Sequence, residues 1–119
     1  MKESQGTVKI TSNNKKEITK VKININDNSI WYFEHDQLKT LALFNYKDFS
    51  LERDNKELYL KYYFKEGKET QNNTLQIKSL NQITNIPIYT KEIVTKNNYI
   101  KIVYSIEQDE FIYELSIEK

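Results

Sequence analysis

Hydrophobic and polar residues alternate with a period of two in several stretches of the chain, which is typical of half-buried β-strands. The alternation is clearest in Thr19–Ile25, where every second residue is Val or Ile. Val21, Ile23 and Ile25 fall on one face, and Lys20, Lys22 and Asn24 fall on the other. We therefore predict a strand here that has one buried face.

The stretch Glu57–Lys65 repeats this alternation with larger side chains. One face carries Leu58, Leu60, Tyr62 and Phe64, and the opposite face carries Tyr59, Lys61, Tyr63 and Lys65. Tyr99–Ile106 and Glu110–Ile117 are also β-rich, and the short polar segment between them predicts a hairpin. Shorter candidate strands are Thr7–Thr11, Ser29–Phe33, Tyr46–Leu51, Thr74–Lys78 and Ile88–Thr95.

Asparagine marks most of the predicted turns, because the chain has only two Gly and one Pro. Asn tolerates turn geometries that most residues resist. The Asn-containing segments at 13–14, 26–28, 72–73 and 97–98 each separate apolar stretches, and Gly67 is expected in a further turn. This spacing predicts a meander of short strands.

Two segments depart from the β pattern. Asp36–Phe44 places Leu38, Leu41 and Ala42 at helical spacing behind an Asp that can cap a helix. Ser79–Ile83 fits the Ser-x-x-Gln capping box and ends before Pro87. We therefore predict one or two short helices among seven to nine strands. The expected fold is mainly β, as a small barrel or a strongly curved sheet.

Composition indicates one domain over residues 1–119. Hydrophobic residues are 38% of the chain and aromatic residues 13%, which is enough to form a core without disulfides. The sequence has no Cys, no apolar leader at its start and no run of about 18 apolar residues that could span a bilayer. A soluble, cytoplasmic protein is expected, although removal of a signal or anchor from a longer precursor fits the same sequence.

Residues that could carry catalysis are few. His35 is the single histidine and lies between Glu34 and Asp36, which suggests a general base or metal ligand, but it lacks the His, Cys or Ser partners that such roles need. The clusters Glu52–Asp54 and Glu107–Glu110 do not have the spacing of a calcium loop. The sequence also lacks a Gly-rich phosphate loop. We expect no enzymatic activity, no cofactor and no metal.

The aromatic and basic face of Glu57–Lys65 suggests nucleic-acid binding. Tyr59 and Tyr63 alternate there with Lys61 and Lys65, so planar rings that can stack on bases lie beside ammonium groups that can meet phosphates. Residues 56–101 carry eight Lys against four Glu, and Lys20 and Lys22 could extend the basic surface if their strand is a neighbour. In the alternative reading, the tyrosines pack under a helix and the lysines are merely solvated.

Trp31 lies in the aromatic run Ile30–Phe33 and also has two readings. Such a run is commonly part of a core. At a barrel mouth, however, the indole would become an anchor for a ligand or a protein partner, because Trp is enriched at interface hot spots.

The absence of Cys, the abundance of Lys, Asn and Ile, and the strand Tyr59–Lys65 together resemble small accessory proteins of Gram-positive bacteria and their plasmids. In size and character the chain is similar to the PrgU-like regulators of enterococcal conjugative plasmids. That resemblance implies a PUA-like β-barrel that binds RNA and restrains production of a plasmid-encoded surface adhesin.

Three functions are therefore compatible with the sequence. The first is an RNA-binding regulator that uses Tyr59, Lys61, Tyr63 and Lys65, with single-stranded RNA as partner. The second is a protein-interaction module, such as an inhibitor, an immunity protein or a conjugation accessory protein, that uses Trp31 or a strand edge. The third is a carrier that holds a small molecule at the barrel mouth.

Overall fold

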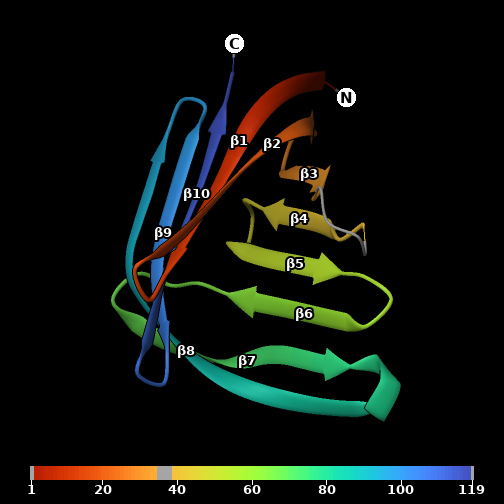
Figure 1. Cartoon of the computed structure of the whole chain (residues 1–119). Helices are drawn as coiled ribbons and strands as arrows, with labels where there is room; N and C mark the ends of the chain where they lie inside the picture. Colours follow the sequence, from red (N-terminus) through yellow and green to blue (C-terminus); the bar gives the residue numbers. More distant parts are fainter. Residues whose placement is uncertain (1, 35–38, 119) are drawn as a thin grey trace.

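The computed structural model describes residues 2–34 and 39–118 and has one closed antiparallel β-barrel (Figure 1). Within the described residues there are ten strands and one 3-10 turn. The strands are β1 (Lys2–Ser12), β2 (Lys15–Ile25), β3 (Ser29–Phe33), β4 (Leu41–Asn45), β5 (Ser50–Asp54), β6 (Leu58–Tyr63), β7 (Lys68–Ile77), β8 (Gln82–Lys96), β9 (Tyr99–Ile106) and β10 (Asp109–Ile117). The 3-10 turn η1 (Lys78–Leu80) connects β7 and β8.

The strands follow one another around the barrel in chain order, and β1 pairs with β10 to close it. Closure is extensive, because the β1–β10 ladder runs from Gly6 opposite Ile117 to Ser12 opposite Phe111. The short strands β3–β6 form one wall, and the long strands β1, β2, β8, β9 and β10 form the other (Figure 1). The predicted small barrel is confirmed, with more strands than the seven to nine expected.

Most of the predicted turns lie where asparagine indicates them. Asn13 and Asn14 both have positive φ, at 50° and 66°, and form the two-residue connection between β1 and β2. Asn98 (φ 64°) turns the chain between β8 and β9, and Gly67 (φ 74°) precedes β7. Positive φ at both central positions is the requirement of the tight hairpin turn that suits twisted strands.

The predicted turn at residues 72–73 is wrong, because both residues lie inside β7. Asn73 is fully buried. Beyond Lys61 opposite Thr74, the backbones of β6 and β7 no longer pair, and the side chain of Asn73 lies where this pairing ends. The Asn73 Oδ1 accepts the backbone N–H of Tyr63 at 2.7 Å, and Nδ2 donates to the carbonyls of Ile86 (2.8 Å) and Thr70 (2.9 Å). This one amide therefore connects β6 to β8.

The helix predicted over Asp36–Phe44 is wrong in its second half, which is strand β4. Asp36 and Leu38 lie outside the described residues. In β4, Ala42 and Phe44 are fully buried while Leu41 and Leu43 point outward, so the period is two. Pairing with β3 and β5 on both sides satisfies the backbone of this segment and overrides its weak helical spacing.

The capping box predicted for Ser79–Ile83 is also absent. The turn η1 begins after Ile77, has no side-chain cap, and is followed at Gln82 by β8. Strand β8 continues through Pro87. No helix within residues 2–34 and 39–118 combines the length and apolar character needed to cross a bilayer.

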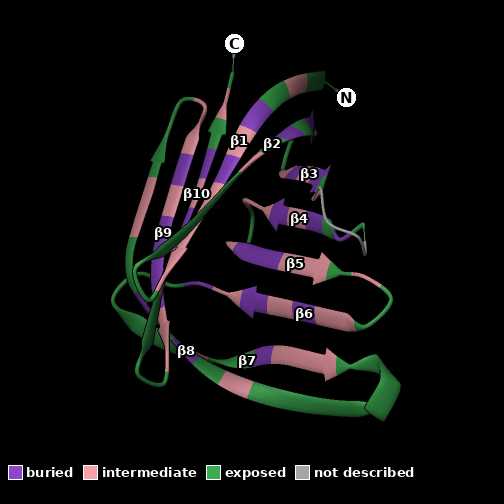
Figure 2. Ribbon diagram, viewed as in Figure 1, coloured by how far each residue is buried: buried purple, intermediate pink, exposed green. Residues whose placement is uncertain are grey.

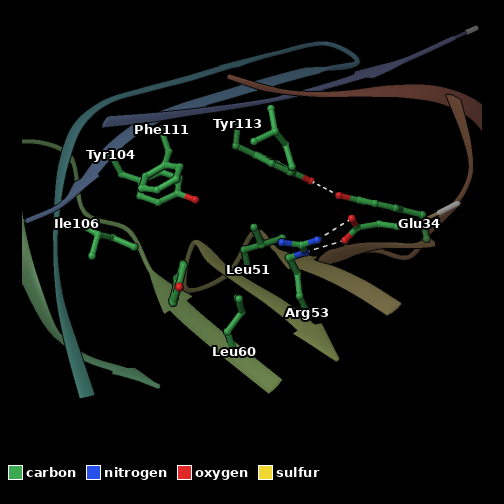
Figure 3. Close-up of a pocket in the computed structure, with 11 residues that line it drawn as sticks. Glu34, Leu51, Arg53, Leu60, Tyr104, Ile106, Phe111 and Tyr113 are labelled. Atoms are coloured by element: carbon green, nitrogen blue, oxygen red, sulfur yellow. Dashed lines mark hydrogen bonds and ion pairs between the residues drawn. The ribbon is translucent and has the colours of Figure 1, made fainter. Parts of the chain in front are cut away.

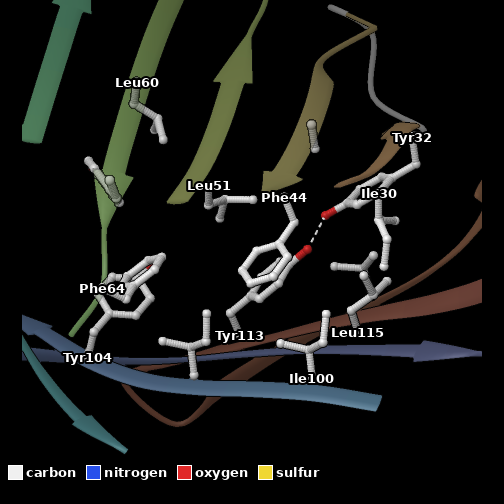
Figure 4. Close-up of a cluster of buried hydrophobic side chains, with 14 of the residues drawn as sticks. Ile30, Tyr32, Phe44, Leu51, Leu60, Phe64, Ile100, Tyr104, Tyr113 and Leu115 are labelled. Carbon is white, nitrogen blue, oxygen red and sulfur yellow. Dashed lines mark hydrogen bonds between the residues drawn. The ribbon is translucent and has the colours of Figure 1, made fainter. Parts of the chain in front are cut away.

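The core fills the barrel from both walls, and buried positions alternate with exposed ones along the strands (Figure 2). The inward faces predicted for the two clearest strands are confirmed, because Val21 and Ile23 on β2 and Leu60 and Tyr62 on β6 are buried. Phe44 lies near the centre, between residues of both walls (Figure 4). The inner surface is continuous, since these side chains belong to a single cluster.

Candidate functional site

A cavity of about 170 Å³ remains inside the barrel (Figure 3). It lies toward the end where β3, β5 and β9 finish, because Glu34, Arg53 and Ile106 belong to its lining. Most of the wall is aliphatic or aromatic. The lining residues are Ile10, Tyr32, Glu34, Leu51, Arg53, Leu60, Tyr62, Tyr104, Ile106, Phe111 and Tyr113.

An ion pair between Glu34 and Arg53 is the charged feature of this cavity. Arg53 Nε donates to Glu34 Oε2 and Arg53 Nη2 donates to Glu34 Oε1, both at 2.7 Å, so the contact is bidentate. The two side chains are 33% and 19% exposed for Arg53 and Glu34, respectively. Solvent therefore reaches both side chains, but only in part.

The strand register explains how these groups meet. Ala42 on β4 is opposite Tyr32 on one side and opposite Arg53 on the other. Its methyl group leaves space on the inner face into which the guanidinium extends toward Glu34, just beyond the end of β3. Burial alone would lower the pKa of Arg53, but the hydrogen bonds to Glu34 outweigh it and the pKa of Arg53 is raised. The guanidinium therefore stays charged.

Four tyrosines surround the ion pair. The hydroxyls of Tyr32 and Tyr113 are 2.6 Å apart and share one hydrogen bond, which joins the two walls of the barrel (Figures 3 and 4). Burial raises the pKa of both hydroxyls well above the ordinary value, so they remain neutral. This hydrogen bond is therefore a second polar contact inside the barrel, close to the Glu34–Arg53 ion pair.

The other two tyrosine hydroxyls are available to a ligand. Tyr104 stacks on Phe111 with ring centroids 5.3 Å apart and an interplanar angle of 19°. Within residues 2–34 and 39–118, neither Tyr104 nor Tyr62 has a hydrogen-bond partner for its hydroxyl, and no buried side-chain polar atom is left unsatisfied. Both hydroxyls therefore reach accessible space. Burial raises the pKa of Tyr104, so this hydroxyl can donate as well as accept.

The predicted nucleic-acid face is formed only in part. Tyr59, Lys61 and Tyr63 do share the outer face of β6, and Lys65 follows it as an exposed residue. However, Lys61 Nζ is 3.4 Å from Glu52 Oε1 and 5.2 Å from the Tyr63 ring centroid. The Tyr59 hydroxyl donates to Glu52 at 3.2 Å. Much of this face is therefore occupied by contacts within the chain.

Lys20 and Lys22 do not extend that face. Both are on β2, and strands β3, β4 and β5 separate β2 from β6 in the barrel wall (Figure 1). The expectation of one continuous basic surface fails because the meander places the two strands on different sides of the barrel.

Trp31 lies on the outer face of β3, whereas its neighbours Ile30 and Tyr32 are buried inside. It contacts Phe33 edge to face, with ring centroids 6.0 Å apart. Trp31 is therefore not part of the core inside the barrel, and its role as an anchor for a ligand or a protein partner stays a prediction. His35 lies outside the described residues, and in the part of the chain that is described no three His, Cys, Asp or Glu side chains are grouped as metal ligands would be.

Sequence reasoning missed the roles of Glu34 and Arg53. It treated Glu34 as a neighbour of His35 and included Arg53 in a carboxylate cluster with Glu52 and Asp54. A signal was present, because Leu51 and Arg53 are two positions apart on a strand and must share the same face. A charged residue at an inward position is a candidate for a functional site.

Fold and cavity together define the protein as a closed antiparallel meander barrel with an aromatic interior and one internal ion pair. The sequence matches no protein-family model and no curated protein. Among solved structures, the fold is similar to the crystal structure of the ywiB protein from Bacillus subtilis. The TM-score is 0.63, with 14% identity, and the match covers 98% of this chain and 94% of that one. This similarity establishes the fold alone.

Proposed function

We propose that this protein is a non-enzymatic binding protein that takes a small, uncharged, ring-containing molecule into its barrel. The observation that carries the proposal is the internal cavity, in which aromatic walls surround a neutralised ion pair. Concave, mostly apolar pockets with a few polar groups in fixed positions are the usual form of small-molecule sites.

The volume limits the ligand. Cavities of about 150 Å³ lined by apolar side chains accept benzene. The cavity here, at about 170 Å³, is slightly larger and fits one ring with a small substituent. The stacked Tyr104 and Phe111 provide a flat wall for such a ring.

The electrostatics favour a ligand without net charge. Glu34 already neutralises Arg53 through two hydrogen bonds, so a ligand ion would enter a partly dry site without a free counter-charge. Polar contacts are still available, because Arg53 has N–H groups that do not bond to Glu34 and the hydroxyls of Tyr62 and Tyr104 are unused. A carbonyl or amide substituent could accept from these donors.

A matched series of probes tests this proposal. We expect benzamide to bind at least roughly tenfold more tightly than benzoate or benzylamine, because the three share a ring but only benzamide is neutral. Toluene should bind more weakly than benzamide, since it cannot accept from Arg53 or the tyrosines. Chemical-shift changes of aromatic side-chain signals in nuclear magnetic resonance titrations measure each affinity.

The substitution Ile106→Trp is a control for the location of the site. Ile106 ends β9 and lines the cavity while remaining only partly buried, so a larger ring there should fill the space with little strain. Benzamide binding should be lost while the circular dichroism spectrum is retained. Equal binding to the parent and the variant, or preference for benzoate, would refute the proposal.

RNA binding is the second candidate function, and the common outer face of Tyr59, Lys61, Tyr63 and Lys65 favours it. We propose that in this case the protein acts as the regulator of adhesin expression that the resemblance to PrgU-like proteins implies. The contacts of Lys61 and Tyr59 with Glu52 count against this candidate, since RNA would have to displace them.

Changing Lys61 and Lys65 together to Glu tests the RNA candidate. If each lysine meets one phosphate, binding of a uridine-rich single-stranded RNA oligomer should weaken strongly, and its salt dependence should fall by at most about two units of slope. Lys20→Glu/Lys22→Glu makes the same change in charge on another side of the barrel and should have little effect. Fluorescence anisotropy at several salt concentrations provides the measurement. No binding by the parent protein at low salt would eliminate this candidate.

A further inference from the structure

An apolar patch covers the outside of the barrel at β3 and β4. Trp31 is opposite Leu43, and Phe33 is opposite Leu41, so two cross-strand pairs lie side by side on the outer face. Phe33 is 53% exposed and Leu41 is 36% exposed. These four residues, called the Trp31 patch below, are not part of the ligand cavity, which lies on the inner face of the same strands.

The two borders of the patch carry opposite charge. On one border, β2 places Asn24 beside Trp31, and continuing this register by one step places Lys22 beside Phe33. On the other border, β5 places Glu52 beside Leu43 and Asp54 beside Leu41. The outer face therefore changes from basic on β2, through apolar on β3 and β4, to acidic on β5.

We infer that the Trp31 patch is the contact surface of a homodimer. In such a dimer, a two-fold axis runs between β3 and β4, parallel to the strands, so that β3 of one copy lies over β4 of the other. Residues that lie side by side across β2–β5 form a row, and each row of one copy packs against the same row of the second copy in the opposite order. This is the symmetry of an isologous interface. Phe33 meets Leu41 of the second copy, Trp31 meets Leu43, and Lys22 meets Asp54.

Lys22 and Asp54 can make these contacts because their ion pairs within the chain are solvent-exposed and therefore weak. Lys22 pairs with Glu3 at 3.2 Å, with both side chains more than half exposed. Asp54 pairs with Lys78 at 2.6 Å and is 49% exposed. Exposed ion pairs contribute little to stability, so either group is free to bind across an interface. The apolar centre provides affinity, and the charged borders fix the orientation.

Reversing a charge on each border of the patch distinguishes a dimer of this orientation from non-specific apolar association. Sedimentation velocity should show that the parent protein dimerises as its concentration rises. The variants Lys22→Glu and Asp54→Lys should each dimerise roughly 100-fold more weakly, because each places like charges together twice in its own homodimer. An equimolar mixture of the two should dimerise like the parent, since both cross-contacts in the mixed dimer again join opposite charges.

A second pair of variants tests the apolar centre. Phe33→Ser should weaken the dimer at least about tenfold, whereas Ile83→Ser should not. Ile83 is a matched control because it is 64% exposed and lies on β8, across the barrel from β3. A parent protein that stays monomeric at every concentration, or a mixture of the charge variants that stays monomeric, would overturn the inference.

Discussion

Replacing Asn73 with Ala is expected to lower the free energy of unfolding by about 3–5 kcal/mol. The amide of Asn73 satisfies the N–H of Tyr63 and the carbonyls of Thr70 and Ile86 in a fully buried position. Each buried backbone group that loses its partner costs about 1–3 kcal/mol, and alanine offers no replacement. Denaturation in urea measures the loss.

Asn72→Ala is the control for this prediction. Asn72 is the neighbouring residue in the same strand, but its side chain is exposed. The same substitution there should change stability by no more than about 0.5 kcal/mol. Equal effects at the two positions would show that the buried amide does not hold β6 to β8.

Arg53→Leu should destabilise the barrel by about 3 kcal/mol, because it leaves the carboxylate of Glu34 facing an apolar cavity without its partner. The expected loss is at the lower end of the range for breaking a buried ion pair, because solvent reaches both side chains. The double variant Glu34→Leu/Arg53→Leu removes both charges and should return close to the stability of the parent. Thermal unfolding of the three proteins measures this double-mutant cycle.

The same double variant also links stability to binding. With both charges and the guanidinium donors absent, the cavity should lose its preference for benzamide over toluene. If the double variant is as unstable as Arg53→Leu, desolvation of Glu34 is not the cause of the loss. A retained preference for benzamide would assign the polar contact to Tyr62 and Tyr104 alone.

The fold was largely predictable because most strands show an alternation of apolar and polar residues in the sequence itself. In residues 19–25 of β2 and in β6, large apolar residues occupy every second, inward-facing position and alternate with Lys, Asn or Tyr, and the asparagines at 13–14 and 97–98 lie at hairpins. The failures share a cause. Residues 41–44 and Asn73 obtain their structure from neighbouring strands, and a single sequence does not show which strands these are.

The site was less predictable than the fold. Grouping residues by their neighbours in sequence placed Arg53 with Glu52 and Asp54, although the side chain of Arg53 points inward and the other two point outward. The proposed basic surface failed for a related reason. Lys22 and Lys61 are each on the outer face of a strand, but strand order determines whether two outer faces are close together. That order follows from closure of the barrel.

Closure by β1 and β10 also constrains the order in which the strands can pair during folding. Every other ladder joins strands that follow one another in the chain, so each closes only a short loop. The β1–β10 ladder must wait for Asp109–Ile117. Until β10 is in place, β1 and β9 are open edges that can pair with other chains. The risk of misassembly is therefore greatest while β10 has not yet paired with β1 and β9.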